Sequence, residues 1–160
     1  HEILSRDTVD QVHFNDILPS LVRMAEDLVT ADHPVRITSG GEAGNVPASV
    51  ATPLAVVVTE LLQNAIEHAY PDEAPPPPDG LQVDIRLQRT GAELRLTVQD
   101  NGIGLPPGFT IEDSKSLGLS IVRSLVGSQL GGTISMRTEG GTVVELRLPL
   151  DQVDDDLDSL

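Results

Sequence analysis

Two short motifs hold the polar side chains best suited to chemistry in this chain of 160 residues. The first is Glu-Leu-Leu-Gln-Asn-Ala-Ile-Glu-His-Ala at residues 60–69. Glu60, Asn64 and His68 follow one another at intervals of four, so on a helix a carboxylate, a carboxamide and an imidazole share one face. The surrounding pattern is apolar, and this polar face therefore predicts a binding site rather than a core contact.

The second motif is Asp-Asn-Gly-Ile-Gly at residues 100–104. It directly follows an alternation of apolar and polar residues that indicates a strand, so we expect Asp100 at the end of that strand. Gly102 and Gly104 let the backbone adopt unusual angles or approach a ligand closely. Together the two motifs predict a nucleotide pocket.

Composition excludes several function classes. The formal net charge of −15, from 25 acidic and 10 basic residues, disfavours DNA and RNA, which are bound through clustered Lys and Arg. The absence of cysteine excludes disulfides and thiolate metal sites. No run of about eighteen apolar residues occurs and no basic-then-apolar leader opens the chain. We therefore expect a cytoplasmic protein with no direct membrane insertion.

The acidic charge also bears on a phosphate ligand. The summed field of the protein should repel a triphosphate. Magnesium and backbone N–H groups must then supply the local attraction. A helix expected to begin near residue 117 offers such N–H groups, with its macrodipole behind them.

Hydrophobic periodicity and chain breakers predict the elements that position these motifs. We expect helices at 9–29, 53–69 and 117–129, with Pro19 favouring a helix start near that proline. Strands are expected at 35–38, 81–87, 92–99, 133–138 and 142–148, with hairpin turns at Thr90-Gly91 and Gly140-Gly141. Residues 72–80 include four consecutive prolines and predict an extended connector. This order predicts an α/β fold, a two-layer sandwich with helices on one face of a mixed, mostly antiparallel sheet.

These motifs resemble the GHKL or Bergerat-fold ATP-binding superfamily. Residues 60–69 resemble its N box, residues 100–104 its first glycine box, Leu117-Gly118-Leu119 its second, and Gly140-Gly141-Thr142 a terminal glycine-threonine element. The pattern looks most like the catalytic and ATP-binding domain of a bacterial two-component sensor histidine kinase of the short-lid subgroup. The resemblance implies binding of Mg-ATP and transfer of the γ-phosphoryl group to a histidine on an upstream domain, for relay to a response-regulator aspartate.

The same resemblance implies roles for individual residues. Asn64 would bind Mg²⁺, and Glu60 would orient or deprotonate the attacking group or a metal-bound water. His68 would reach the phosphates. Asp100 would accept a hydrogen bond from the exocyclic amine of adenine, with Thr142 assisting through its hydroxyl and a water.

Further nucleotide-binding residues are expected at the end of the first motif, in the glycine box and in the lid. Lys115 is the one lysine in the chain, and we expect it at a phosphate. The sequence departs from the family at Glu67, where a lysine is common, which removes a phosphate contact. The complete set of these additional residues is Ala69, Tyr70, Gly102, Ile103, Gly104, Lys115, Ser116, Leu117, Gly118 and Leu119.

The resemblance also implies a domain organisation. Residues 1–8 would end a preceding dimerisation and phosphoacceptor region, and residues 9–150 would form the catalytic ATP-binding domain. The tail at 151–160, which holds five aspartates, is expected to be disordered rather than a calcium site, because the loop spacing and glycine of such a site are absent. We expect a monomeric fragment of low activity from a homodimeric full-length protein.

Two other classes share this pocket. One is an anti-sigma-factor type, either a serine kinase or a non-catalytic nucleotide-binding regulator. The other is a clamp ATPase, which the short chain and missing transducer domain disfavour. No P-loop, dinucleotide-binding or His-Glu-x-x-His motif occurs, so P-loop enzymes, Rossmann oxidoreductases and zinc proteases are excluded.

Overall fold

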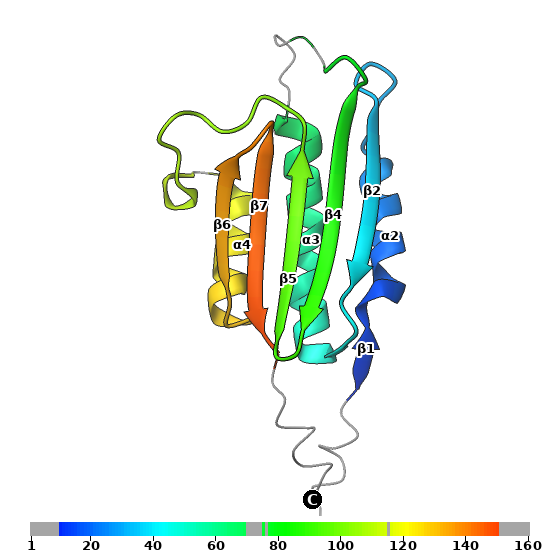
Figure 1. Cartoon of the computed structure of the whole chain (residues 1–160), viewed down its shortest axis with the longest axis vertical. Helices are drawn as coiled ribbons and strands as arrows, with labels where there is room; N and C mark the ends of the chain where they lie inside the picture. The colour runs from blue at the N-terminus through cyan, green and yellow to red at the C-terminus, as the bar shows by residue number, and fades with distance from the viewer. Residues whose placement is uncertain (1–9, 70–74, 76, 115, 151–160) are drawn as a thin grey trace, which may run out of the picture.

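The computed structural model describes residues 10–69, 75, 77–114 and 116–150. Within them, three helices cover one face of a five-stranded sheet (Figure 1). The strands of this sheet are β2 (Val35–Glu42), β4 (Leu81–Thr90), β5 (Glu93–Asp100), β6 (Thr133–Thr138) and β7 (Thr142–Pro149). The helices are α2 (Phe14–Glu26), α3 (Ala48–His68) and α4 (Leu117–Ser128), and a short 3-10 helix, η1 (Ile111–Asp113), precedes α4.

The strand order across the sheet is β2-β4-β5-β7-β6. The pair β2–β4 is parallel, and the pairs β4–β5, β5–β7 and β6–β7 are antiparallel. Alternation along the central strands turns one set of side chains toward the helices and the other away, as the period of two requires. The predicted fold class, a two-layer sandwich with a mixed and mostly antiparallel sheet, is confirmed.

The core lies between this sheet and α3. Leu54, Leu61 and Leu62 of α3 are almost fully buried, and Val83 and Leu96 face them from the sheet. Among the described residues, α3 is the one helix long and apolar enough to cross a membrane. Here its apolar residues pack into the core, so α3 holds the first motif on a fixed central element.

Two helices begin earlier than predicted. α2 begins at Phe14 rather than near Pro19, and α3 begins at Ala48 rather than at Pro53. Each proline lies in the second turn, where its missing N–H removes one helical hydrogen bond. Residues ahead of each proline still pack in the core: Phe14 is fully buried ahead of Pro19, and Ala51 is buried ahead of Pro53. Tertiary packing therefore extends both helices ahead of their prolines.

A small second sheet fixes these helix starts. β1 (Gln11–His13) pairs with β3 (Asn45–Pro47) in antiparallel fashion, so residues 11–13 are a strand and not part of the predicted helix. The Ala48 N–H donates to the Asp10 carbonyl oxygen at 3.0 Å, directly before α3. Strands of three residues are too short to show a periodicity of two, which is why the sequence did not indicate them.

β2 also continues beyond its predicted end. It runs to Glu42, past the predicted end at residue 38 and through Gly40 and Gly41. Gly41 has φ of 86°, and a Cβ there would lie 1.8 Å from the Leu87 carbonyl oxygen. This glycine therefore permits close approach to β4 rather than ending the strand.

Candidate functional site

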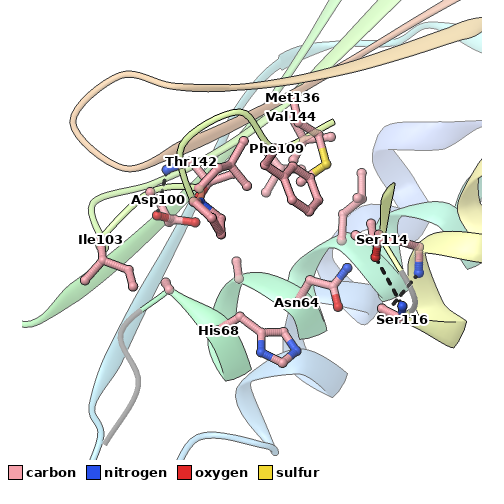
Figure 2. Close-up of a pocket in the computed structure, with 18 residues that line it drawn as sticks. Asn64, His68, Asp100, Ile103, Phe109, Ser114, Ser116, Met136, Thr142 and Val144 are labelled. Carbon is pink, nitrogen blue, oxygen red and sulfur yellow. Dashed lines mark hydrogen bonds between the residues drawn. The ribbon is translucent and has the colours of Figure 1, made fainter. Parts of the chain in front are cut away.

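A cavity of about 350 Å³ opens between α3, α4 and the ends of β5 and β7. Figure 2 shows side chains from these elements converging on it. The two motifs therefore meet, although residues 60–69 and 100–104 are separate in the chain. The predicted residues that line the cavity are Asn64, His68, Ala69, Asp100, Ile103, Gly104, Ser116, Leu119 and Thr142.

Apolar side chains make up much of the remaining lining. Val98 and Val144 come from the central strands, Met136 comes from β6, and Phe109 comes from the loop before η1. Sequence reasoning did not assign Met136, although its place in an alternating strand put it on the helix-facing side. An apolar chamber with few polar groups is typical of small-molecule sites and suits a flat heterocyclic base.

Asp100 is the polar centre at one end of this cavity. Among the residues that the structure describes, it is the one buried charged side chain, at 6% exposure. Its Oδ1 accepts hydrogen bonds from the Gly102 N–H at 2.9 Å and the Thr142 N–H at 3.0 Å. Its Oδ2 receives no hydrogen bond from the described residues and is available to a ligand donor.

Burial sets the ionisation of Asp100. Removal from water disfavours the charged form and raises the pKa of this carboxyl above its ordinary value, while the two N–H donors partly oppose the rise. An ionised carboxylate in this position can accept a hydrogen bond from an exocyclic amine. A carbonyl oxygen at the same place would be repelled, so this end of the cavity suits a ligand that presents a hydrogen-bond donor.

The glycine turn after Asp100 is held closely against neighbouring backbone. A Cβ on Gly102 would lie 1.9 Å from the Ala69 carbonyl oxygen, which itself accepts a hydrogen bond from the Ile103 N–H at 2.6 Å. Any side chain at position 102 would separate the turn from the end of α3. Gly102 does not line the cavity, and its first role is packing against α3.

The other side of the turn contacts β6. The Leu105 N–H donates to Thr138 Oγ1 at 3.0 Å, and a Cβ on Gly104 would lie 2.6 Å from Thr138 Cγ2. Gly141 is equally confined, since a Cβ there would lie 2.0 Å from the Asp100 carbonyl oxygen. Gly102, Gly104 and Gly141 thus allow β5, β6, β7 and α3 to meet around Asp100.

The opposite end of the cavity is formed by α3 and the start of α4. The Nδ2 atom of Asn64 is buried and has no hydrogen-bond partner among the described residues. A buried amide without a partner is costly to the empty fold, so it indicates a position that a ligand completes. His68 lies one turn further along α3, is exposed, and also lines the cavity.

Glu60 lies beside this end of the cavity and is not part of its lining. Its carboxylate faces the first turn of α4, because a Cβ on Gly118 would lie 2.7 Å from Glu60 Oε2. Gly118 is also outside the lining, and Leu117 is 75% exposed. These predicted residues therefore lie outside the cavity lining, at the first turn of α4.

The start of α4 faces the same end. Ser116 is the N-cap residue, and its Oγ accepts a hydrogen bond from the Leu119 N–H at 3.3 Å. Ser114 Oγ accepts a hydrogen bond from the Ser116 N–H at 3.1 Å, as Figure 2 shows. Two predicted ligands, Tyr70 and Lys115, lie outside the described residues, as do 1–8 and 151–160.

Magnesium is compatible with this set of residues. No group of three or more His, Asp or Glu side chains in the described part of the chain could hold a metal ion by itself. Mg²⁺ usually takes one or two protein oxygens and completes its shell with phosphate oxygens and water. The Asn64 side chain can contribute its Oδ1 as one such oxygen, whereas its partnerless Nδ2 is a hydrogen-bond donor suited to a phosphate oxygen.

Comparison with known proteins agrees with this geometry. The sequence profile of the histidine kinase-, DNA gyrase B- and HSP90-like ATPases matches residues 49–152. The sensor histidine kinase PdtaS of Mycobacterium tuberculosis is 41% identical over 152 residues, which cover 94% of this chain and 30% of that protein. The chain thus spans about a third of the length of the curated relatives it matches.

Two solved structures show the same fold. The histidine kinase domain of the blue-light-activated histidine kinase EL346 from Erythrobacter litoralis superposes with a TM-score of 0.68 at 30% identity, over 84% of this chain and 61% of that one. The catalytic domain of histidine kinase ThkA superposes with a TM-score of 0.71 at 21% identity, over 88% and 96%. The chain therefore belongs to the histidine kinase-, DNA gyrase B- and HSP90-like ATPase family, as an ATP-binding domain of the histidine kinase type.

Proposed function

We propose that this domain binds Mg-ATP in the cavity and donates its γ-phosphoryl group to a histidine on an upstream dimerisation and phosphoacceptor domain, for relay to a response-regulator aspartate. The observation that carries the proposal is the pairing of two unlike groups in one cavity. Asp100 offers an acceptor at the apolar end, and Asn64 presents at the other end an amide whose Nδ2 donor has no partner among the described residues. This arrangement suits a ligand with a base at one end and a cation-bound phosphate chain at the other.

The adenine end would work by hydrogen bonding in an apolar enclosure. Asp100 Oδ2 would accept from the exocyclic amine, and the Thr142 hydroxyl would assist through a water. Val98, Met136 and Val144 would exclude bulk water from the ring faces. Ile103, which is 60% exposed at the cavity edge, would lose exposed apolar area when the base binds.

The phosphate end would work by alignment. Asn64 would hold Mg²⁺, which neutralises phosphate charge when bound. His68 and the N–H groups at the start of α4 would receive the phosphate chain without the need for many basic side chains. Phosphoryl transfer depends largely on positioning and charge neutralisation. These contributions would allow a protein with a net charge of −15 to bind a triphosphate.

Glu60 is proposed to orient or deprotonate the incoming imidazole. Its carboxylate lies against the first turn of α4, beside the cavity rather than inside it. A base in that position would meet the acceptor without competing for the nucleotide. A fragment that lacks the acceptor domain would then bind ATP while transferring little phosphate.

A response regulator is the proposed final acceptor. The solved structure of ThkA with its response regulator TrrA contains a chain that superposes on this one with a TM-score of 0.71. At 21% identity that likeness establishes the fold, and the partner remains part of the proposal. We further propose a cytoplasmic location, with a monomeric domain in a homodimeric full-length protein.

The test is phosphorylation of the full-length protein with γ-labelled ATP, followed by acid treatment. We expect an acid-labile, base-stable phosphohistidine that moves to a response regulator and is lost in the Asn64→Ala variant. Asp84→Asn, on the opposite face of the sheet, is the matched control and should retain the label. Acid-stable phosphoserine would favour the anti-sigma type, and hydrolysis without a protein adduct would favour a clamp ATPase.

A further inference from the structure

Asn101 stands between the carboxylate that faces the cavity and the first glycine of the turn, yet it does not line the cavity. Its side chain is directed to the start of β4. Asn101 Oδ1 accepts a hydrogen bond from the Gln82 N–H at 2.7 Å, and Asn101 Nδ2 donates to the Gly80 carbonyl oxygen at 3.1 Å. Its backbone N–H also donates to the Gln82 carbonyl oxygen, at 3.2 Å.

These contacts continue the sheet where its regular pairing stops. The β4–β5 ladder ends at the pair Val83–Asp100, and beyond it the Asn101 side chain takes the place of a strand partner for residues 80–82. The turn is fixed at two later points as well, by Ile103 on α3 and Leu105 on β6. Asn101 provides the attachment that directly follows the carboxylate.

A carboxamide is the side chain that suits both partners. The Gln82 N–H can only donate and the Gly80 carbonyl can only accept, so the site requires one acceptor and one donor at short reach. These two backbone groups also determine which way round the amide lies. An aspartate at 101 would keep the acceptor and place a second oxygen against the Gly80 carbonyl, and an alanine would provide neither.

We propose that Asn101 is a positioning residue for nucleotide binding: its amide ties the glycine turn to β4 and so keeps the Gly102 N–H on the Asp100 carboxylate. The inference rests on the proposed function of the cavity as an ATP site. Without this attachment, the turn must be ordered at each binding event, and the cost of that ordering appears as weaker affinity. Asn101 acts through Asp100 and makes no contact with the nucleotide.

The test measures Mg-ATP binding to this domain by calorimetry, for the parent protein and for Asn101→Ala. We expect a rise in Kd of roughly five- to tenfold, as the loss of two neutral hydrogen bonds suggests. Gln82→Ala is the matched control, because it removes an exposed side chain and leaves the backbone groups that Asn101 uses. It should bind ATP like the parent.

A pH series separates positioning from general loosening. The Gly102 N–H lowers the pKa of Asp100, so loss of that contact should make ATP affinity fall at a higher pH when the solution is acidified from neutral to about pH 5. His68 is the other titratable side chain in the described lining. It is present in both proteins, so the difference between their profiles reports Asp100.

The outcomes are distinct. A folded Asn101→Ala protein with the parent's Kd and pH profile overturns the inference, as does a weaker Kd with an unshifted profile. If the alanine variant melts below the assay temperature, Asn101→Ser is judged by the same two criteria, because it adds no titratable group beside Asp100. Asp100→Ala tests the site itself, and undiminished ATP binding by that variant would contradict the proposed function. If Asp100→Ala loses ATP binding while Asn101→Ala binds ATP like the parent, only the inference about Asn101 is contradicted.

Discussion

Asp100 and Asn64 line the same cavity, but the protein prepares their surroundings in different ways. Around Asp100, two backbone N–H groups, three closely confined glycines and the Asn101 amide are already in place. Around Asn64, a buried amide nitrogen has no partner in the described part of the chain. The proposed adenine end already has its protein contacts in place, whereas the proposed phosphate end has a donor that only a ligand would satisfy.

This contrast has a physical reason. An adenine ring is rigid, so a fixed acceptor and a fixed apolar enclosure can recognise it without rearrangement. A triphosphate with its cation supplies its own charges and must be presented to a separate acceptor group. A site that is completed by the ligand can change between binding, transfer and release, which a fully satisfied network would resist.

The largest expected effect comes from a substitution that disrupts the backbone contacts of the turn after Asp100. In Gly102→Ala the new Cβ would lie 1.9 Å from the Ala69 carbonyl oxygen, so the turn must move away from α3. We expect a loss of about 3 kcal/mol in the free energy of unfolding, measured by urea denaturation without nucleotide. Gly127→Ala is the control, because its Cβ meets nothing within 4 Å, and it should stabilise α4 by up to about 1 kcal/mol. Equal effects of both substitutions would show that the turn does not depend on this contact.

A smaller effect is expected at the phosphate end, and it should fall on binding rather than on stability. Asn64→Ala removes a buried polar group that lacks a partner, so the empty domain should unfold at the same or a slightly higher urea concentration. Its affinity for Mg-ATP should fall about tenfold, with a weaker dependence on magnesium concentration. Gln63→Ala, the neighbour outside the lining, should leave both unchanged. A marked loss of stability in Asn64→Ala would mean that Asn64 already has a structural role.

The smallest expected effect is a pH dependence. It distinguishes folding from binding at the Asp100 end of the cavity, because the stability of the empty domain and its affinity for ATP change with pH in opposite directions. Burial raises the pKa of Asp100 in the folded state above its ordinary value of 3.8, so the folded protein holds that proton to higher pH than the unfolded chain. Stability of the empty domain therefore falls as the pH rises from 3.8 through the raised pKa. We expect ATP affinity instead to fall as the pH drops through the same range, because the proposed contact with adenine uses the ionised carboxylate.

Asp100→Asn removes this titration. The difference in unfolding free energy between Asp100→Asn and the parent should therefore grow in favour of the variant as the pH rises, and then level off above the raised pKa. Urea denaturation of both proteins at a series of pH values measures it. A difference that stays constant across the series would show that Asp100 titrates alike in the folded and unfolded states.

The positions of Asn64, His68 and Asp100 could be predicted from the sequence because their signals are local. Four-residue spacing on an apolar helix and an acid at the end of an alternating strand each identify a side chain that leaves the core pattern. The same reasoning predicted the two hairpins, which the structure shows as the antiparallel pairs β4–β5 and β6–β7. It placed the helix starts too late, because the effect of Pro19 and Pro53 was offset by packing that lies elsewhere in the chain.

The sequence could not show what confines the turn. Gly102 was interpreted as permitting close approach to a ligand, and the structure instead places it against the Ala69 carbonyl oxygen. Asn101 gave no separate signal, since its partners at residues 80–82 belong to a different strand. Met136 was not assigned to the site because its strand pattern indicates a face of the sheet and not which cavity that face encloses.

By itself, the sequence determined the fold class and predicted an ATP pocket built from two motifs, because periodicity, glycine placement and charged groups in apolar runs are properties of neighbouring residues. The tertiary structure alone decided which groups meet. Asp100 draws its hydrogen bonds from β7 and from its own turn, the turn rests on α3, β4 and β6, and Glu60 faces α4. Such contacts join residues far apart in the chain, and only packing of the sheet against its helices brings them within bonding distance.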